Sequence, residues 1–308
     1  MAGTLGSLLA HLRGIAIITP WALALLIQDF LLSLLLLLRP FNPLLAYRLS
    51  SPIAWSCWAG IQFIFERLNG AMVIVSGDKL PVGESAVVIA NHVGWSDFYM
   101  IQSLAMRAKM LGYCRYCAKA QLKKVPLLGW GLMAMGMPLV TRNWQQDKRE
   151  LDRVFSGITQ HRFPTWLVSF SEATRFTPQK HQEMQKWCSE NGRPQPQHLL
   201  YPRTRGFIAT VQQVRHAAHV KAVYDLTIAY RHAATFQEAP PFWDTIRSGG
   251  LSKGPGGYRF EVHLRRFAME DLPLEDAQLA KWLETRWVEK GEWLERKRVQ
   301  WEAEDQGR

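Results

Sequence analysis

Cysteine is scarce in this chain, with four residues in 308. Their spacing is irregular, which excludes the disulfide framework of a small secreted fold. Cys114 and Cys117 form one C-x-x-C pair, but no second pair follows at the spacing of a zinc site. We therefore predict buried or free thiols in a reducing compartment, and no metal or redox centre.

The sequence also lacks an internal repeat, and no helical stretch gathers arginines with interleaved aromatic residues, as a nucleic-acid-binding helix would. The net charge of +11 still indicates anionic partners, namely phospholipid, nucleic acid or phosphorylated substrates. The Leu-rich N-terminus favours lipid, so we expect a membrane partner and no nucleic acid. With 48% hydrophobic residues, the chain can bury a full α/β core in one or two domains.

One long apolar run covers residues 15–38. As a helix it is long enough to cross a hydrocarbon core of ~30 Å. Its apolar side chains favour insertion by roughly 5 to 9 kcal/mol, against a cost of about 3 kcal/mol for the central Asp29. The run ends in Arg39 and Pro40 rather than at a small-residue cleavage site, so an anchor is favoured over a signal peptide.

A second apolar stretch, residues 52–65, is short for a span and predicts an interfacial or re-entrant helix that packs on the first. Asp29 either faces this second helix or marks a break in the first one. A slight excess of basic residues after the first run favours a cytosolic location for the domain that follows. Residues 1–68 are thus the predicted membrane-anchoring region.

From Met72 onward, short β-rich runs alternate with amphipathic segments, which predicts an α/β fold. A loop region rich in Pro and Gly, residues 240–257, suggests a core domain at 69–240 and a C-terminal part at 241–308. The Trp-rich tail at 274–304 is expected to be helical, split in two by Gly291, and packed on the domain rather than on a membrane. The expected strands are 72–76, 85–90, 138–140, 165–170, 222–230 and 258–265; the expected helices are 97–109, 125–135, 147–161 and 207–216.

A polar turn, residues 91–97, directly follows the apolar run 86–90, so it should lie at the carboxyl end of a buried strand, where sites form in α/β sheets. On one continuous helix, His92 and Asp97 would be about 140° apart. They can meet if His92 lies in the turn and Ser96 caps a helix that begins at Asp97. Asp97 would then orient the imidazole, leaving it free to act as a general base. Taken alone, the pair is better explained by a capping histidine beside an ordinary N-terminal aspartate.

Three more polar clusters follow strand-like runs. The first is Thr141-Arg142, and the second runs from Glu172 through Thr174 to Arg175, where a guanidinium can grip phosphate. The third, Pro202-Arg203, precedes a predicted helix N-terminus that offers N–H groups to an anion. Each cluster alone is compatible with ordinary solvated surface.

In order, the motifs N-H-x-x-x-x-D, an Arg-ending strand, F-x-E-x-T-R and P-R-T-x-G-F resemble the four blocks of the glycerolipid acyltransferase family, in particular its 1-acyl-glycerol-3-phosphate and lysocardiolipin branch. The resemblance implies a mixed-sheet domain flanked by helices. It also implies a transfer from acyl-CoA to the sn-2 hydroxyl of a lysophospholipid, expected to be 1-acyl-glycerol-3-phosphate with phosphatidate as the product, without a cofactor and at membranes such as the endoplasmic reticulum. It assigns base and orienting roles to His92 and Asp97, and substrate contacts to Asn91, Arg142, Glu172, Thr174, Arg175, Pro202 and Arg203.

The chain departs from the family pattern at two positions. Thr141 precedes Arg142 where the family usually has Asp, and Ala173 replaces the glycine of E-G-T-R, which matters if that residue needs a positive φ. Two alternatives stay open: a larger headgroup on the acceptor, such as lysocardiolipin or lysophosphatidylinositol, and a non-catalytic protein that shapes or tethers membranes. The sequence leaves the acyl chain and the oligomeric state undetermined.

Overall fold

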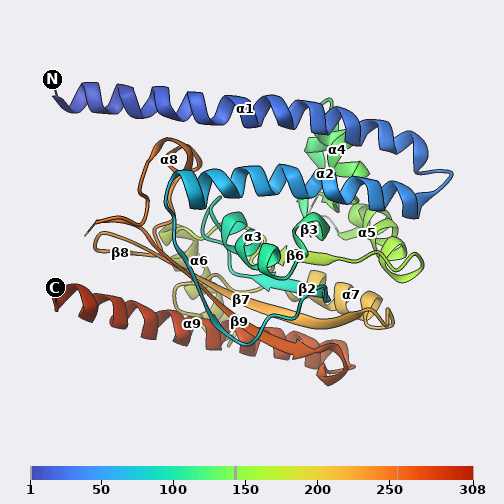
Figure 1. The fold of residues 1–308 in the computed structure, drawn as a ribbon. Helices are drawn as coiled ribbons and strands as arrows, with labels where there is room; N and C mark the ends of the chain where they lie inside the picture. The colour runs from blue at the N-terminus through green and yellow to red at the C-terminus, as the bar shows by residue number, and fades with distance from the viewer. Residues whose placement is uncertain (1, 142–143, 255, 308) are drawn as a thin grey trace.

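The computed structural model describes residues 2–141, 144–254 and 256–307 (Figure 1). Two long N-terminal helices lead into a sheet, and one long helix ends the chain. The α-helices are α1 (Ala2–Leu38), α2 (Pro43–Phe63), α3 (Asp97–Arg107), α4 (Leu128–Ala134), α5 (Trp144–Thr159), α6 (Pro178–Glu190), α7 (Thr204–Val214), α8 (Phe242–Arg247) and α9 (Asp276–Gln306).

The main sheet is mixed, with the order β1-β9-β7-β2-β6-β3 and the short β8 paired to β7. Strands β2, β3, β6 and β7 run parallel, and β9 pairs antiparallel with β7. The strands are β1 (Val73–Gly77), β2 (Ser85–Ala90), β3 (Cys114–Tyr116), β6 (Trp166–Phe170), β7 (Val220–His232), β8 (Thr235–Phe236) and β9 (Arg259–Ala268); β4 (Ala118–Lys119) and β5 (Leu139–Val140) form a separate pair. The α/β expectation is confirmed.

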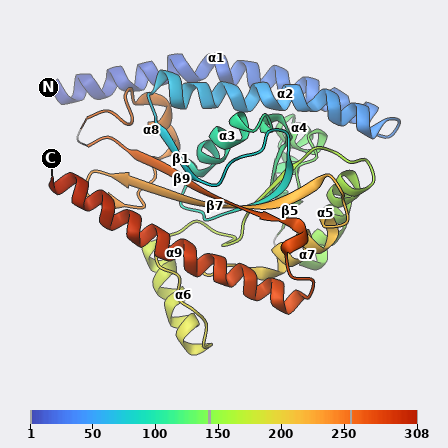
Figure 2. The same cartoon turned by 60° about the horizontal axis from the view of Figure 1, so that its bottom comes forward.

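The two faces of the sheet carry different helices. Helices α1, α2 and α3 lie on one side, and α9 crosses the other (Figure 1). Side chains of β2 alternate accordingly: Val88 joins the core under α2 and α3, while Val87 joins the one under α7 and α9. All six residues of β2 are buried, which explains why this strand could be predicted to the residue. In a second view, α6 projects from the body beneath α9 (Figure 2).

Helix α1 runs unbroken through Asp29, so the predicted alternative of a break there is wrong. Asp29 is buried against α4, where a Cβ on Gly131 would lie 2.5 Å from its Oδ1. The neighbouring Gln28 donates to Ser56 of α2, 2.9 Å away. The second apolar stretch forms α2 and packs on α1, as expected.

Helix α9 is continuous, so the expected split at Gly291 is wrong. A Cβ at Gly291 would lie only 2.7 Å from the backbone nitrogen of Gln197. The glycine therefore permits a close approach of the helix to the chain before α7, and does not end a helix. The tail packs on the sheet, as predicted, and buries Trp287 and Trp301.

Candidate active site

His92 and Asp97 meet as their spacing predicted. His92 lies in the turn after β2 and Asp97 is the first residue of α3, with 2.7 Å between His92 Nδ1 and Asp97 Oδ2. Ser96 precedes the helix, but its hydroxyl donates to the Pro240 carbonyl at 2.8 Å and caps nothing. A cap must accept from a backbone N–H, and Ser96 instead has helical dihedral angles (φ −64°, ψ −13°) and makes no such bond, so the predicted Ser96 cap is wrong. Asp97 itself accepts from the free N–H groups of the turn.

Four donors converge on the buried Asp97 carboxylate. Oδ2 accepts from the imidazole and from the backbone N–H groups of Val93 and Gly94, at 2.7 and 3.1 Å. Oδ1 accepts from the hydroxyl of Tyr230 at 2.7 Å. Burial, followed by the charge of Asp97, raises the pKa of Tyr230 well above its usual range, so this hydroxyl remains a donor. The carboxylate is thus fixed in position and can orient the imidazole.

The imidazole of His92 has one occupied and one free nitrogen. Its ring stacks on Phe170, at the end of β6, with 4.1 Å between centroids and 15° between planes. Within the described part of the chain, Nε2 has no hydrogen-bond partner, and the side chain stays 14% exposed. If Nδ1 carries the proton donated to Asp97, Nε2 presents a lone pair towards solvent. This is the arrangement that a general base needs.

Asn91 ties β2 to β7 beside this pair. Its Nδ2 donates to the Ile228 carbonyl at 3.0 Å, and its Oδ1 accepts from the Ile228 N–H at 2.7 Å. The side chain is fully buried. Asn91 therefore holds the strand edges together, whereas the substrate contact expected of it stays a prediction.

The loop that contains Glu172 and Arg175 is fixed by backbone hydrogen bonds to two other motifs. The N–H of Phe176 donates to the His92 carbonyl, and the N–H of Arg203 donates to the Ser171 carbonyl, both at 2.7 Å. Ala173, in the position of the family glycine, has a φ of +57°. This left-handed conformation is one that alanine adopts at a cost of about 1 kcal/mol or more. The turn geometry is thus kept despite the substitution.

Glu172 points inwards from this loop. It is 3% exposed, and its Oε1 accepts from the indole N–H of Trp287 on α9 at 3.4 Å. Its Oε2 has no hydrogen-bond partner among the described residues. Burial raises the pKa of the Glu172 carboxyl well above its usual range. In this arrangement Glu172 links the loop to α9, and its expected contact with substrate is untested.

Thr174, Arg175 and Arg203 lie on the accessible side of the same edge. Arg175 and Arg203 are exposed, while Pro202 between the loops is buried. The ammonium of Lys180, on α6, donates to the Thr174 hydroxyl at 2.7 Å and to the Arg175 carbonyl at 3.2 Å. The edge therefore gathers positive charge close to His92. Arg142 lies outside the described residues; the Thr141 N–H before it donates to Asp147 at 2.6 Å.

Sequence reasoning did not single out Tyr230, Phe170, Lys180 or Trp287. Tyr230 and Phe170 end predicted strands, so their position at the site edge was implicit once β6 and β7 were known to run parallel to β2. Trp287 belongs to the Trp-rich tail, but its contact with Glu172 was not predicted, because that contact depends on how α9 crosses the sheet.

The fold and the site together define an α/β protein with a histidine–carboxylate pair of the acid–base kind at the carboxyl edge of its parallel strands. The acyltransferase family model matches residues 72–231, and an acyltransferase C-terminus model matches residues 253–296. The chain belongs to the acyltransferase family.

Curated relatives fall into two groups. The chain is 33% identical to probable 1-acyl-sn-glycerol-3-phosphate acyltransferase 5 of Arabidopsis thaliana, over 72% of this chain and 56% of that protein. It is 30% identical to bovine 1-acyl-sn-glycerol-3-phosphate acyltransferase delta, over 83% of this chain and 65% of that protein. It is 28% identical to lysocardiolipin acyltransferase 1 of Gallus gallus, over 90% of this chain and 72% of that protein. The chain thus spans little more than half of the first relative's length.

Proposed function

We propose that the protein transfers an acyl group from acyl-CoA to the sn-2 hydroxyl of 1-acyl-glycerol-3-phosphate. The observation that carries this proposal is the His92–Asp97 pair, with Nδ1 bonded to a buried carboxylate and Nε2 free at the sheet edge. The choice of 1-acyl-glycerol-3-phosphate as the acceptor is supported by relatives that are named as its acyltransferases. The exposed Arg175 and nearby Lys180 give the site the charge that a phosphomonoester requires.

In this mechanism Nε2 of His92 takes the proton of the acceptor hydroxyl as its oxygen attacks the thioester carbonyl. The C–S bond then breaks, and the proton on the imidazolium passes to the departing thiolate of coenzyme A. Asp97 stabilises the imidazolium and keeps the imidazole oriented. Because the N–H groups of Val93 and Gly94 already donate to Asp97, the oxyanion must be stabilised by other donors.

The test uses purified full-length protein, labelled oleoyl-CoA and a panel of lysolipids. We expect the wild type to form phosphatidate from lysophosphatidate, and His92→Gln and Asp97→Asn to lose at least 10³-fold in kcat. Arg175→Gln should raise KM for lysophosphatidate, whereas the exposed Lys186→Gln on α6 should not. Substantial activity of the His92 variant would exclude its role as base.

A larger headgroup is the second candidate, favoured by the lysocardiolipin acyltransferases among the relatives. The same panel decides between them, because a preference for lysocardiolipin or lysophosphatidylinositol over lysophosphatidate would overturn the first acceptor. No transfer to any acceptor would instead favour the non-catalytic membrane protein.

Helix α1 is the one helix in the described residues that is long and apolar enough to cross a membrane. We propose that it anchors the protein by lying along the bilayer surface, in place of the crossing that its length and composition predict. Near its start Arg13 donates to the Arg247 carbonyl at 3.1 Å, and just past its end Arg39 donates to the Met133 carbonyl at 3.1 Å. Because the domain contacts α1 at both ends, a perpendicular crossing would bring α4 or α8 into the hydrocarbon.

A depth measurement tests this proposal. Spin labels at Leu9, Leu23 and Leu37, which are 57%, 58% and 71% exposed, cover about 42 Å of helix. We expect equal depths at all three. A helix that crosses would place Leu23 deep and the other two near opposite headgroups. The endoplasmic reticulum, expected from eukaryotic family members, and the cytosolic face, expected from the basic residues after the first apolar run, stay predictions. Fractionation of the source cell and protease protection would test them.

A further inference from the structure

A small cavity lies at the sheet edge opposite the candidate active site. It measures about 20 Å³, which is room for about one water-sized group. Thr165, directly before β6, lines it, and this residue is five positions before Phe170, roughly 16 Å at ~3.3 Å per residue. The cavity is therefore separate from the His92 edge.

Three arginines line this cavity: Arg39 after α1, Arg115 in β3 and Arg153 in α5. Arg115 is only 2% exposed. Its Nη1 donates to the carbonyls of Gly112 and Cys114, both at 2.9 Å, and its guanidinium lies 4.6 Å from the ring centroid of Tyr47. Its Nε and Nη2 have no hydrogen-bond partner among the described residues. A buried guanidinium with two unpaired donors is costly unless something accepts from them.

Among the described residues, Glu150 is the carboxylate that contacts this cluster, and it does not balance the three cations. Glu150 contacts Arg153 at 2.6 Å and Lys123 at 3.3 Å, so one carboxylate is shared by two cations. Nη1 of Arg153 is also buried without a partner among the described residues. Burial, and after it the charge of Arg153, lower the pKa of Arg39. Arginine does not deprotonate in proteins, so this cluster stabilises the fold best when an anion joins it.

We propose that this cavity, the arginine cavity, binds a phosphoryl group through one oxygen that accepts from Arg115, while Arg39 and Arg153 contact the remaining oxygens at its mouth. The cavity has room for one oxygen, and planar guanidinium groups suit phosphate. The arginine cavity is distinct from the candidate active site at the His92 edge, and the phosphoryl-binding proposal does not depend on the proposed acyl transfer.

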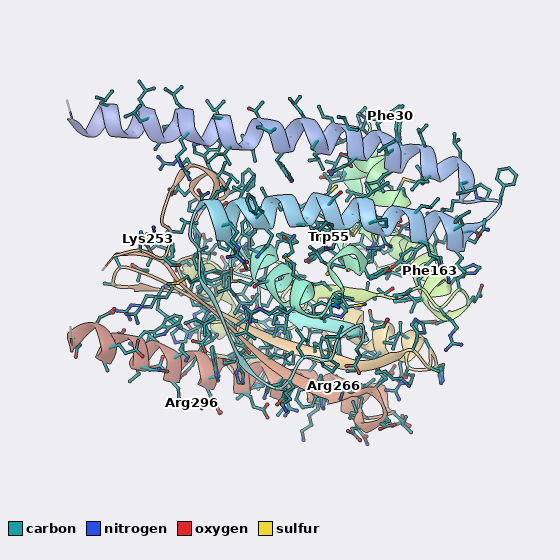
Figure 3. All side chains as sticks on the ribbon, viewed as in Figure 1. Phe30, Trp55, Phe163, Lys253, Arg266 and Arg296 are labelled. Carbon is teal, nitrogen blue, oxygen red and sulfur yellow. The ribbon has the colours of Figure 1, made fainter. Side chains whose placement is uncertain are left out.

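Two sources can supply such a group: an anionic lipid headgroup or free phosphate. Arg39 directly follows the apolar α1, and Phe41 in the next turn is 86% exposed, which puts the mouth next to the membrane-facing helix. In Figure 3 Phe163, another residue of the cavity wall, lies at the end of the molecule where α1 turns into α2. A headgroup bound there would couple the anchor to the start of β6.

The test is the thermal stability of the full chain. In neutral detergent, inorganic phosphate is titrated at constant ionic strength, with gluconate as the balancing anion, so that the response to phosphate is measured against a singly charged carboxylate. In the second arm, phosphatidylglycerol is titrated into phosphatidylcholine nanodiscs. Mass action predicts a saturable rise in Tm for an anion that binds the folded state. A response in the phosphate arm alone identifies free phosphate as the ligand. A response to phosphatidylglycerol in the nanodisc arm, without added phosphate, identifies a lipid headgroup.

Variants separate the cavity from general charge effects. Arg39→Gln removes a partly exposed cation, and Arg115→Met removes the buried one while filling its volume. We expect each to weaken the apparent affinity at least tenfold. Arg296→Gln, on an exposed position of α9 away from Phe163 (Figure 3), is the matched control and should respond as the wild type does.

Arg39→Gln keeps the test decisive if Arg115→Met does not fold. No saturable response of the wild type in either arm, or equal responses of the wild type and Arg39→Gln, would overturn the proposal.

Discussion

At the scale of single residues, Tyr230 decides how firmly Asp97 is held. Its hydroxyl is the donor to Oδ1, while the imidazole and the two turn amides use Oδ2. A hydrogen bond to a charged group contributes about 1.5–3 kcal/mol. Without it, the carboxylate can rotate and the imidazole loses its fixed direction. Tyr230 is therefore a positioning residue, because it contacts Asp97, which in turn contacts His92.

We predict that Tyr230→Phe lowers kcat about tenfold or more and leaves KM for both substrates nearly unchanged, as follows from the loss of one charge-assisted hydrogen bond. Steady-state rates with lysophosphatidate and oleoyl-CoA measure this. Tyr99→Phe is the matched control, because that buried hydroxyl contacts Thr245 at 3.1 Å and not Asp97. Equal losses in both variants would mean that Tyr230 acts only through stability.

Glu172 gives a prediction with a defined sign. Its carboxyl keeps its proton in the folded state to a higher pH than in the unfolded chain, because burial raises its pKa. The unfolded state therefore releases the proton first, and folding stability falls as pH rises above the ordinary value of ~4.3. We predict that Glu172→Gln removes this loss, so the variant gains stability relative to the wild type from pH 5 to pH 8. Tm values across that range measure it, and parallel curves would contradict it.

At the scale of elements, α9 shows how packing overrides local preference. Alanine is a better helix former than glycine by about 1 kcal/mol, and the sequence pattern suggested that Gly291 splits the tail. The helix instead continues, and its glycine lies against the backbone at Gln197. This contact lets Trp287 reach Glu172, so a residue of the C-terminal element supports the loop of the candidate active site.

We predict that Gly291→Ala destabilises the protein by about 1–3 kcal/mol, since the added methyl group overpacks a backbone contact. Gly206→Ala in α7 is the control, because a Cβ there meets nothing within 4 Å. That control should be neutral or stabilise by up to ~1 kcal/mol through helix propensity. Denaturant unfolding of both variants measures the difference. A stabilised Gly291 variant would show that the close approach is absent in solution.

At the scale of the whole molecule, α1 is part of the folded body as well as the proposed anchor. The indole of Trp243 in α8 donates to His11 at 2.9 Å, and the indole of Trp21 donates to the Cys57 carbonyl of α2 at 3.0 Å. Leu32 is fully buried in the core that also contains β2 and α3. A helix that served only as a tether would not share a core with the sheet.

We predict that deletion of residues 2–42 lowers Tm by more than 10 °C or leaves the domain insoluble, because α2, α4 and α8 lose an apolar cover. The control is the intact chain with a protease site inserted at Phe41, cut after folding. The two pieces should stay associated in detergent and keep the Tm of the uncut protein. A deletion variant with unchanged Tm would show that α1 contributes nothing to the fold.

The sequence alone determined the α/β class, the limits of β2 and the meeting of His92 with Asp97. These depend on local pattern, because a β-branched apolar run is buried and a turn followed by a helix fixes the geometry over five residues. Only the tertiary structure decided that Tyr230 completes the carboxylate site, that Glu172 turns inwards to Trp287, and that three arginines from α5, β3 and the end of α1 share one cavity. Contacts between segments so far apart in the chain depend on how whole elements cross, which no local pattern encodes.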